Sequence, residues 1–139
     1  APADHPRSGA PAGGEGGVSL CLVLPLPPDR LNARVHWAKR RKLENLWQSR
    51  ALTWLYREGQ RRPEKPIDRA TVAVHVVSKR AMDLDNATAR GCKLPLDFLR
   101  RAGWLVDDGP EHVAALTVTT ATDRARPRIE ITITPIEGE

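Results

Sequence analysis

The stretch "RIEITITPI", residues 128–136, carries the clearest structural pattern in this sequence. Ile129, Ile131 and Ile133 alternate with polar residues. Successive side chains of a β-strand point to opposite faces, so this alternation predicts a strand with one buried and one exposed face. The segment is therefore expected to border the core of the domain.

Three further strands are predicted around it. The stretch "HVAALTVTTATD" (112–123) is followed by "DRARPR", and we expect it to form a hairpin with residues 128–136. The stretch "ATVAVHVVS" (70–78) predicts a strand with valines 72, 74 and 76 on one face and His75 on the other. The aliphatic run "VSLCLVLP" (18–25) predicts the first strand, with Cys21 as a small buried hydrophobic residue.

Two helices are predicted between the strands. Residues 34–60 have helical apolar spacing and end at Gly59 and Pro63, with Trp47 and Trp54 expected in the core. The prediction of this helix is based on the spacing of five apolar residues, Leu43, Trp47, Leu52, Leu55 and Tyr56. Residues 85–102 predict a second helix, capped by Asp85 or Asn86, kinked over 91–95 by Pro95, and closed by Gly103. The resulting order, β-α-β-α-β-β, predicts an α+β (mixed α/β) domain with a small mixed sheet and two main helices.

The composition favours a single basic domain with a nucleic-acid partner. The 139 residues include 22 Lys and Arg against 17 Asp and Glu, a net charge of +5. Such an excess favours a polyanionic partner, although many small soluble domains are basic without one. Residues 1–17, rich in Gly, Pro and Ala, are expected to be a disordered tail before one domain over 18–139. No apolar run approaches the roughly 20 residues that span a bilayer, so no membrane association is expected. Two widely spaced cysteines favour a reducing compartment.

Two acidic motifs stand out against this positive charge. In "DLDN" (83–86), Asp83 and Asp85 face the same side if the chain there is extended. Two carboxylates at such a separation repel each other unless a cation lies between them or one of them is protonated. Mg²⁺ is such a cation, and it prefers oxygen ligands. Asp107 and Asp108 would add a further carboxylate if the stretch "WLVDD" (104–108) forms a short strand back past the start of the second helix. A helix cap at "DLDN" and a simple turn at "DDG" are the alternative interpretations.

Basic residues supply candidates for phosphate binding. Lys93 would reach towards a phosphate at the carboxylates, or would form an ordinary i,i+4 ion pair with Asp97. A basic cluster near the first helix, with an aromatic residue for base stacking, predicts a DNA surface or else a solvated helix face. Its candidates are Arg30, Asn32, Arg34, His36, Trp37, Lys39, Arg40, Arg41 and Lys42. Arg100 and Arg101 form a second basic set.

The combination of these motifs resembles the RusA family of Holliday junction resolvases. The matching stretches are "DLDN" (83–86), "KLPLDFLRRAG" (93–103), Asp107-Asp108, and the opening "LPLPPDRLN" with its Asn32. The similarity covers about residues 19–136. Between Asp85 and Lys93 this chain has four residues more than the best-known member, close to one helical turn.

The resemblance implies a RusA-like fold and a homodimeric, Mg²⁺-dependent endonuclease, with Mn²⁺ as a possible substitute. It implies cutting of four-way DNA junctions by paired nicks in recombination and repair, in the cytoplasm of a bacterium or a phage-infected cell. It also implies that Asp83, Asp85 and Asp108 bind metal, with Asp107 assisting, and that Lys93 is catalytic, with Arg90 as an alternative. Two other functions stay open, namely a metal-dependent nuclease for flaps or forks and a non-catalytic nucleic-acid-binding module.

Overall fold

The computed structural model describes residues 19–28, 36–82, 87–88 and 92–136. The described chain is a mixed α+β fold in the predicted order β-α-β-α-β-β. Its elements are β1 (Leu20–Leu24), α1 (Trp37–Arg57), β2 (Ala70–Ser78), α3 (Lys93–Arg101), β3 (Val113–Thr122) and β4 (Arg128–Pro135).

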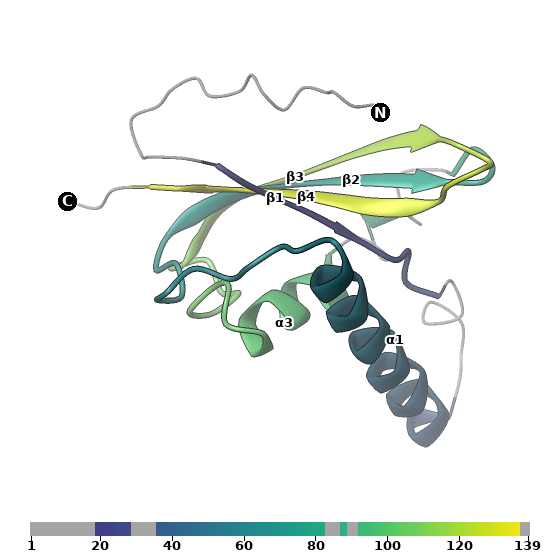
Figure 1. The fold of residues 1–139 in the computed structure, drawn as a ribbon, viewed down its shortest axis with the longest axis horizontal. Coiled ribbons are helices and arrows are strands. Elements are labelled where there is room, and N and C mark those ends of the chain that lie inside the picture. The colour runs from purple at the N-terminus through teal and green to yellow at the C-terminus, as the bar shows by residue number, and fades with distance from the viewer. Residues whose placement is uncertain (1–18, 29–35, 83–86, 89–91, 137–139) are drawn as a thin grey trace.

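The four strands form one mixed sheet in the order β1-β4-β2-β3. β4 is antiparallel to both of its neighbours, β1 and β2, whereas β2 and β3 are parallel. Both helices lie on the same side of this sheet (Figure 1). The opposite side is not covered by either helix and is called the open face below.

The core forms around the isoleucines of β4. Ile131 pairs with Leu22 of β1 on one side and with Val74 of β2 on the other. Ile129 and Ile133 have equivalent neighbours, and all three isoleucines are at most 1% exposed. Full burial of such a side chain contributes about 1.5–3 kcal/mol, so this column is a main source of stability. The alternation predicted for residues 128–136 is confirmed.

The predicted hairpin between the last two strands is wrong. β2 lies between β3 and β4, and residues 123–127 carry the chain over the end of β2. The Asp123 amide donates to the Ser78 carbonyl at 2.8 Å, which fixes this crossing. The apolar content of the two strands agrees with this order: β4 has apolar neighbours on both sides, and β3 has Thr120 at the inward position where β2 has Val76. β3 takes the edge position.

The first helix packs through its second half only. Trp47 is 2% exposed, its Nε1 donates to the Pro25 carbonyl at 2.8 Å, and its ring meets Phe98 edge-on at 5.6 Å. Trp54, also expected in the core, is half-buried. Leu52 and Tyr56 were expected on the apolar side of this helix, but they are 54% and 88% exposed, so that part of the prediction is wrong.

The second predicted helix is interrupted at Cys92. Residues 87–88 are helical, Cys92 is not, and α3 begins at Lys93, whereas residues 85–86 and 89–91 lie outside the described chain. The interruption falls within the predicted kink over 91–95. Pro95 thus falls in the first turn, where helix amides need no partner within the helix, so it causes no interior clash. Gly103 ends the helix with φ +87°, as the sequence predicted. In place of the short strand expected at 104–108, the structure has one isolated β-bridge, between Leu105 and Ile67.

The open face of the sheet is polar and lined with small side chains. Cys21 lies there, exposed and 3.8 Å from the Thr132 hydroxyl, so the prediction that it is buried is wrong. The apolar residues around Cys21 did not reveal that its side chain points away from the face on which Leu22 and Leu24 are buried. The side chain of His75 is on the same face, where its Nδ1 lies 2.7 Å from the Thr119 hydroxyl. This agrees with the prediction that His75 faces away from the valines.

Trp47→Ala is expected to destabilise the fold strongly. The change removes a buried ring and its packing against Phe98, and it leaves the Pro25 carbonyl without its donor. We expect the free energy of unfolding, measured by chemical denaturation, to fall by about 3–5 kcal/mol. Leu46→Ala is the matched control, because Leu46 is 60% exposed on the same helix. Equal losses in the two variants would contradict the packing described here.

Candidate functional site

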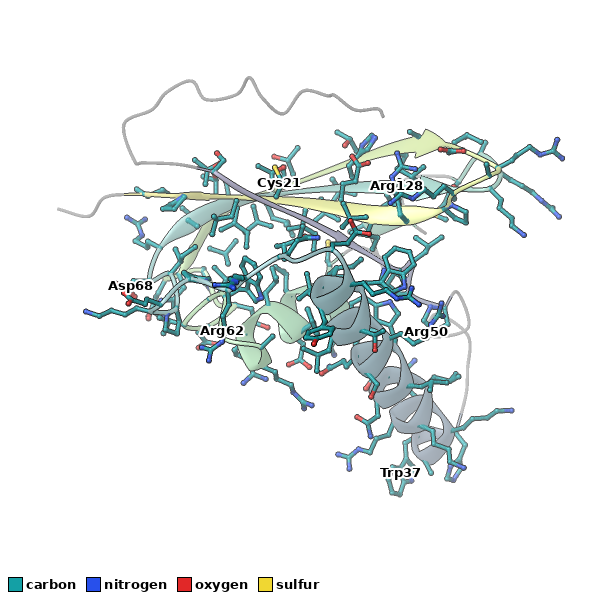
Figure 2. All side chains as sticks on the ribbon, in the orientation of Figure 1. Cys21, Trp37, Arg50, Arg62, Asp68 and Arg128 are labelled. Carbon is teal, nitrogen blue, oxygen red and sulfur yellow. The ribbon has the colours of Figure 1, made fainter. Side chains whose placement is uncertain are left out.

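The first half of α1, residues 37–46, extends away from the sheet (Figure 1) and is called the basic arm. None of its residues is buried. Trp37 is 69% exposed and lies at the end of the helix farthest from the sheet (Figure 2). His36 precedes it, stacks on its ring at 5.8 Å, and accepts the Ala38 amide hydrogen at its Nδ1. The basic residues of the arm are Lys39, Arg40, Arg41 and Lys42.

The charge of the basic arm opposes the preference of its own helix. The N-terminal end of a helix carries a partial positive charge and is stabilised by acidic residues. The first turn of α1 has no acidic residue, and four consecutive cations lie within its first two turns. Such a local conflict is expected where function outweighs stability. The arm therefore combines exposed positive charge with an exposed aromatic ring, as proteins that bind nucleic acids do.

The acidic pair, Asp107 and Asp108, lies just before β3. Because β3 is parallel to β2, the pair lies near the end of the sheet where both strands begin. Asp68, just before β2, marks this end in Figure 2. Both carboxylates of the acidic pair are exposed, and Asp107 Oδ1 accepts the Asp108 amide hydrogen at 2.8 Å. That hydrogen bond lowers the pKa of Asp107, so its carboxylate is negatively charged at neutral pH.

Two cationic groups lie near the acidic pair. The pKa of Arg100 is raised mainly by its hydrogen bond to Asp97, with smaller contributions from Asp108 and Asp107. His112 Nδ1 lies 2.8 Å from the Asp68 carbonyl and 3.1 Å from its carboxylate, and these contacts raise the pKa of His112. Sequence reasoning did not identify this contact, since its two residues are 44 positions apart and no local pattern links them.

Lys93 is not joined to the acidic pair. It is exposed at the first position of α3, whereas Asp107 and Asp108 follow the other end of that helix. Within the described chain it shares no hydrogen bond or ion pair with them or with Asp97. Asp97 instead binds Arg100 at 2.6 Å and Arg101 at 3.2 Å. The alternative prediction of a Lys93–Asp97 ion pair is therefore wrong. Arg100 and Arg101, the second basic set, both form ion pairs with Asp97.

Several predicted site residues lie outside the described residues. Among those in the described ranges, no group of three or more His, Cys, Asp and Glu side chains is placed to hold a metal ion. A site formed by "DLDN" and the acidic pair is not tested by that finding, because half of it is not described. The residues outside are Asp83, Asp85, Arg30, Asn32, Arg34 and Arg90.

A hollow of about 880 Å³ opens beside the second half of α1. It is bounded by Tyr56, Arg61 and Arg62 on one side and by Ala102 and Trp104, after α3, on the other. Sequence analysis assigned no site role to these residues. None of the predicted site residues lines this hollow.

The chain was compared with known proteins. No protein-family model matches it, and no curated protein is significantly similar to it in sequence. The resemblance to RusA proteins thus stays a hypothesis based on the motifs quoted above. Neither described helix combines the length and apolar character that crossing a bilayer requires.

The pKa of His112 is expected to depend on Asp68. Asp68→Asn removes the carboxylate but keeps the backbone carbonyl, so the pKa should fall yet stay above its ordinary value of 6.5. Because the folded-state pKa is raised, the interaction stabilises the fold fully below the unfolded-state pKa. That stabilisation disappears as the pH rises through the folded-state pKa.

NMR titration of the histidine ring signals measures this pKa directly. His75 is the internal control, because its ring contacts Thr119 and not Asp68. An unchanged His112 titration in Asp68→Asn would show that the carboxylate has no part in the shift.

Proposed function

We propose that this protein is a Mg²⁺-dependent, structure-selective endonuclease that resolves four-way DNA junctions by paired nicks. The observation that carries the DNA-binding part is the basic arm, an exposed helix half with four consecutive cations and an exposed tryptophan. The cutting part rests on the carboxylates of "DLDN" and the acidic pair, and on the resemblance to RusA proteins. A homodimer fits this function, since paired nicks need two active sites.

DNA binding by the arm has a direct physical basis. Cations on an exposed helix neutralise phosphates and release counterions, which gives affinity that falls with salt. Trp37, 69% exposed, presents a flat apolar surface on which an unpaired base at a junction centre can stack. The neighbouring His36 holds that ring by stacking at an interplanar angle of 26°.

The carboxylates fit a hard cation chemically. Asp107 is ionised at neutral pH, and both members of the acidic pair are accessible. Asp83, Asp85 and Asp108 would hold Mg²⁺ or Mn²⁺, with Asp107 assisting. Such a cation supplies activation of water and neutralisation of the charge that develops on a cleaved phosphodiester. Lys93 is exposed, and its role would be to bind the phosphate rather than another residue of the site.

A binding module without catalysis is the second candidate function. One observation favours it: the Asp107 carboxylate already accepts a hydrogen bond from the next amide, as in an ordinary turn. In that case the acidic pair would be structural, and the basic arm would carry the whole activity. A nuclease for flaps or forks would share the cutting chemistry and differ in its preferred substrate.

Removing charge from the basic arm is expected to weaken DNA binding. We expect Lys39→Ala, Arg41→Ala and Lys42→Ala together to raise the Kd for a four-way junction. They should also lower the slope of log Kd against log salt by about 0.9 for each phosphate that the variant no longer neutralises. Fluorescence anisotropy at several salt concentrations measures both quantities.

The control for this experiment removes the same charge elsewhere. Lys65, Arg69 and Arg124 are exposed cations outside α1, and their replacement by alanine should leave most of the affinity and slope intact. Equal effects of the two triple variants would mean that net charge, and not the arm, determines binding.

Asp83→Asn and Asp108→Asn are expected to abolish cutting while sparing junction binding. Each removes one carboxylate from the proposed metal site, and we expect cleavage of a labelled four-way junction to fall by at least about 100-fold. The measurement is a gel assay with Mg²⁺ and with EDTA, beside linear duplex, flap and fork substrates. Glu111→Gln is the control, as an exposed carboxylate near the acidic pair but outside the motif. Full cleavage by Asp83→Asn would refute the assignment, and binding without any cutting by the wild type would favour the binding module.

A further inference from the structure

The hollow of about 880 Å³ beside the second half of α1 has the size of a small-molecule site. Ligand pockets in proteins usually measure about 300–1,000 Å³ and combine an apolar lining with a few polar groups. Leu52, Leu55 and Ala102 contribute apolar surface to this hollow, and its polar groups include those of Tyr56 and of residues 61–64. Its size and its composition are therefore those of a binding site.

Two arginines at the hollow carry charge that the described part of the chain does not neutralise. Within the described ranges, the side chains of Arg61 and Arg62 form no hydrogen bond or ion pair. Glu64 is the only carboxylate among the described residues that line the hollow, and it pairs with neither arginine. The Arg62 side chain lies against Gly103, where an added Cβ would come within 3.2 Å of Arg62 Nη1. The hollow therefore offers positive charge to an anion.

Trp104 contributes a hydrogen-bond donor that has no partner. The residue is 3% exposed and lines the hollow, yet in the part of the chain that the structure describes its indole N–H donates to no acceptor. Trp47, which is buried to the same degree, donates to the Pro25 carbonyl. The large majority of buried donors in proteins have such a partner. An acceptor atom in the hollow would supply the partner that Trp104 lacks.

Tyr56 adds an exposed aromatic ring to the same lining. Its side chain is 88% exposed, so the ring contributes little to the core. Proteins that bind single strands combine cations with aromatic rings on which bases stack. The lining thus offers charge for an anionic group, a donor for an acceptor atom, and an aromatic surface for a flat ring. A nucleotide carries all three.

We infer that this hollow binds one nucleotide unit, with its phosphate on Arg61 and Arg62 and its base against Tyr56. Guanidinium groups recognise phosphate through paired hydrogen bonds. Inorganic phosphate alone would leave Tyr56 and the apolar surface unused. The inference goes beyond the proposed function, because none of these residues belongs to the basic arm or to the proposed metal site. A free nucleotide and an unpaired nucleotide of a DNA strand share this chemistry, and binding measurements separate the two.

NMR of the indole N–H groups in the full chain reports where a nucleotide binds. Thymidine 5′-monophosphate should shift the signal of Trp104 and leave that of Trp47, whose N–H is already bonded, in place. The signal of Trp37 reports binding at the basic arm. A single strand of thymidines that binds at Trp104 more tightly than the monophosphate would identify an unpaired strand as the source. Equal or weaker binding of the strand would identify the free nucleotide.

Tyr56→Ala is expected to weaken binding of thymidine 5′-monophosphate without disturbing the fold. Loss of the stacking surface should raise the Kd, measured from the Trp104 signal, at least about fivefold. Tyr56→Phe is the matched control, because it keeps the ring and should bind as the wild type does. An unchanged Trp47 signal in both variants would show that the core is intact.

Removing both arginines is expected to have a larger effect. Arg61→Ala combined with Arg62→Ala should raise the Kd for the monophosphate at least about tenfold, because the charge-assisted hydrogen bonds to phosphate are lost. The control combines Lys65→Ala with Arg69→Ala, which removes the same charge from exposed residues that do not line the hollow. This control should change the Kd little.

Three results would overturn the inference. The first is the absence of a Trp104 shift, whether or not Trp37 responds. The second is inorganic phosphate that moves the Trp104 signal with the same Kd as the monophosphate, and the third is an unchanged Kd in the double arginine variant. Junction cleavage by the same samples tests the proposed function separately. A protein that binds the nucleotide in the hollow but cuts no DNA would support the inference and contradict the nuclease.

Discussion

The isoleucine column of β4 is the constraint on which the rest of this structure depends. Ile129, Ile131 and Ile133 are buried between the leucines of β1 and the valines of β2, which places β4 inside the sheet. With β4 in that position, β3 lies on the other side of β2 and is parallel to it. The crossing of residues 123–127 and the edge position of β3 are consistent with this packing requirement. The parallel pair in turn places the acidic pair beside the start of β2.

The anchoring of α1 has a similar effect on the candidate DNA surface. Trp47, Ala51 and Leu55 recur on one side of the helix and attach its second half to the sheet. No buried residue precedes Trp47 in this helix, so residues 37–46 have no buried side chain that would hold them against the core. The sequence of the arm therefore determines both its charge and its exposure.

Much of the fold could be predicted from the sequence, because local periodicity reports burial. The strand at 70–78, the isoleucine alternation and the glycine that ends α3 were all predicted from such patterns. The strand order was not, since it depends on competition between β2 and β3 for β4, and no short segment shows that competition. The exposure of Cys21 was missed because the residues on both faces of β1 are apolar, so the sequence shows no alternation between buried and exposed positions. Of the candidate site, the exposed cations were predictable from composition, whereas the His112–Asp68 interaction depends on how two distant strands begin together.

The separation between the basic arm and the acidic pair limits what this protein can bind. The acidic pair lies near Asp68, and Figure 2 shows Asp68 at the left of the molecule and Trp37 at its lower end. The helix that carries the arm alone is 21 residues long, which corresponds to about 30 Å. A mononucleotide cannot bridge such a distance, but a duplex arm or a branched junction can. If both surfaces act on one ligand, that ligand must be a polymer, and a basic arm with an exposed aromatic ring favours a nucleic acid with unpaired bases over a uniform duplex.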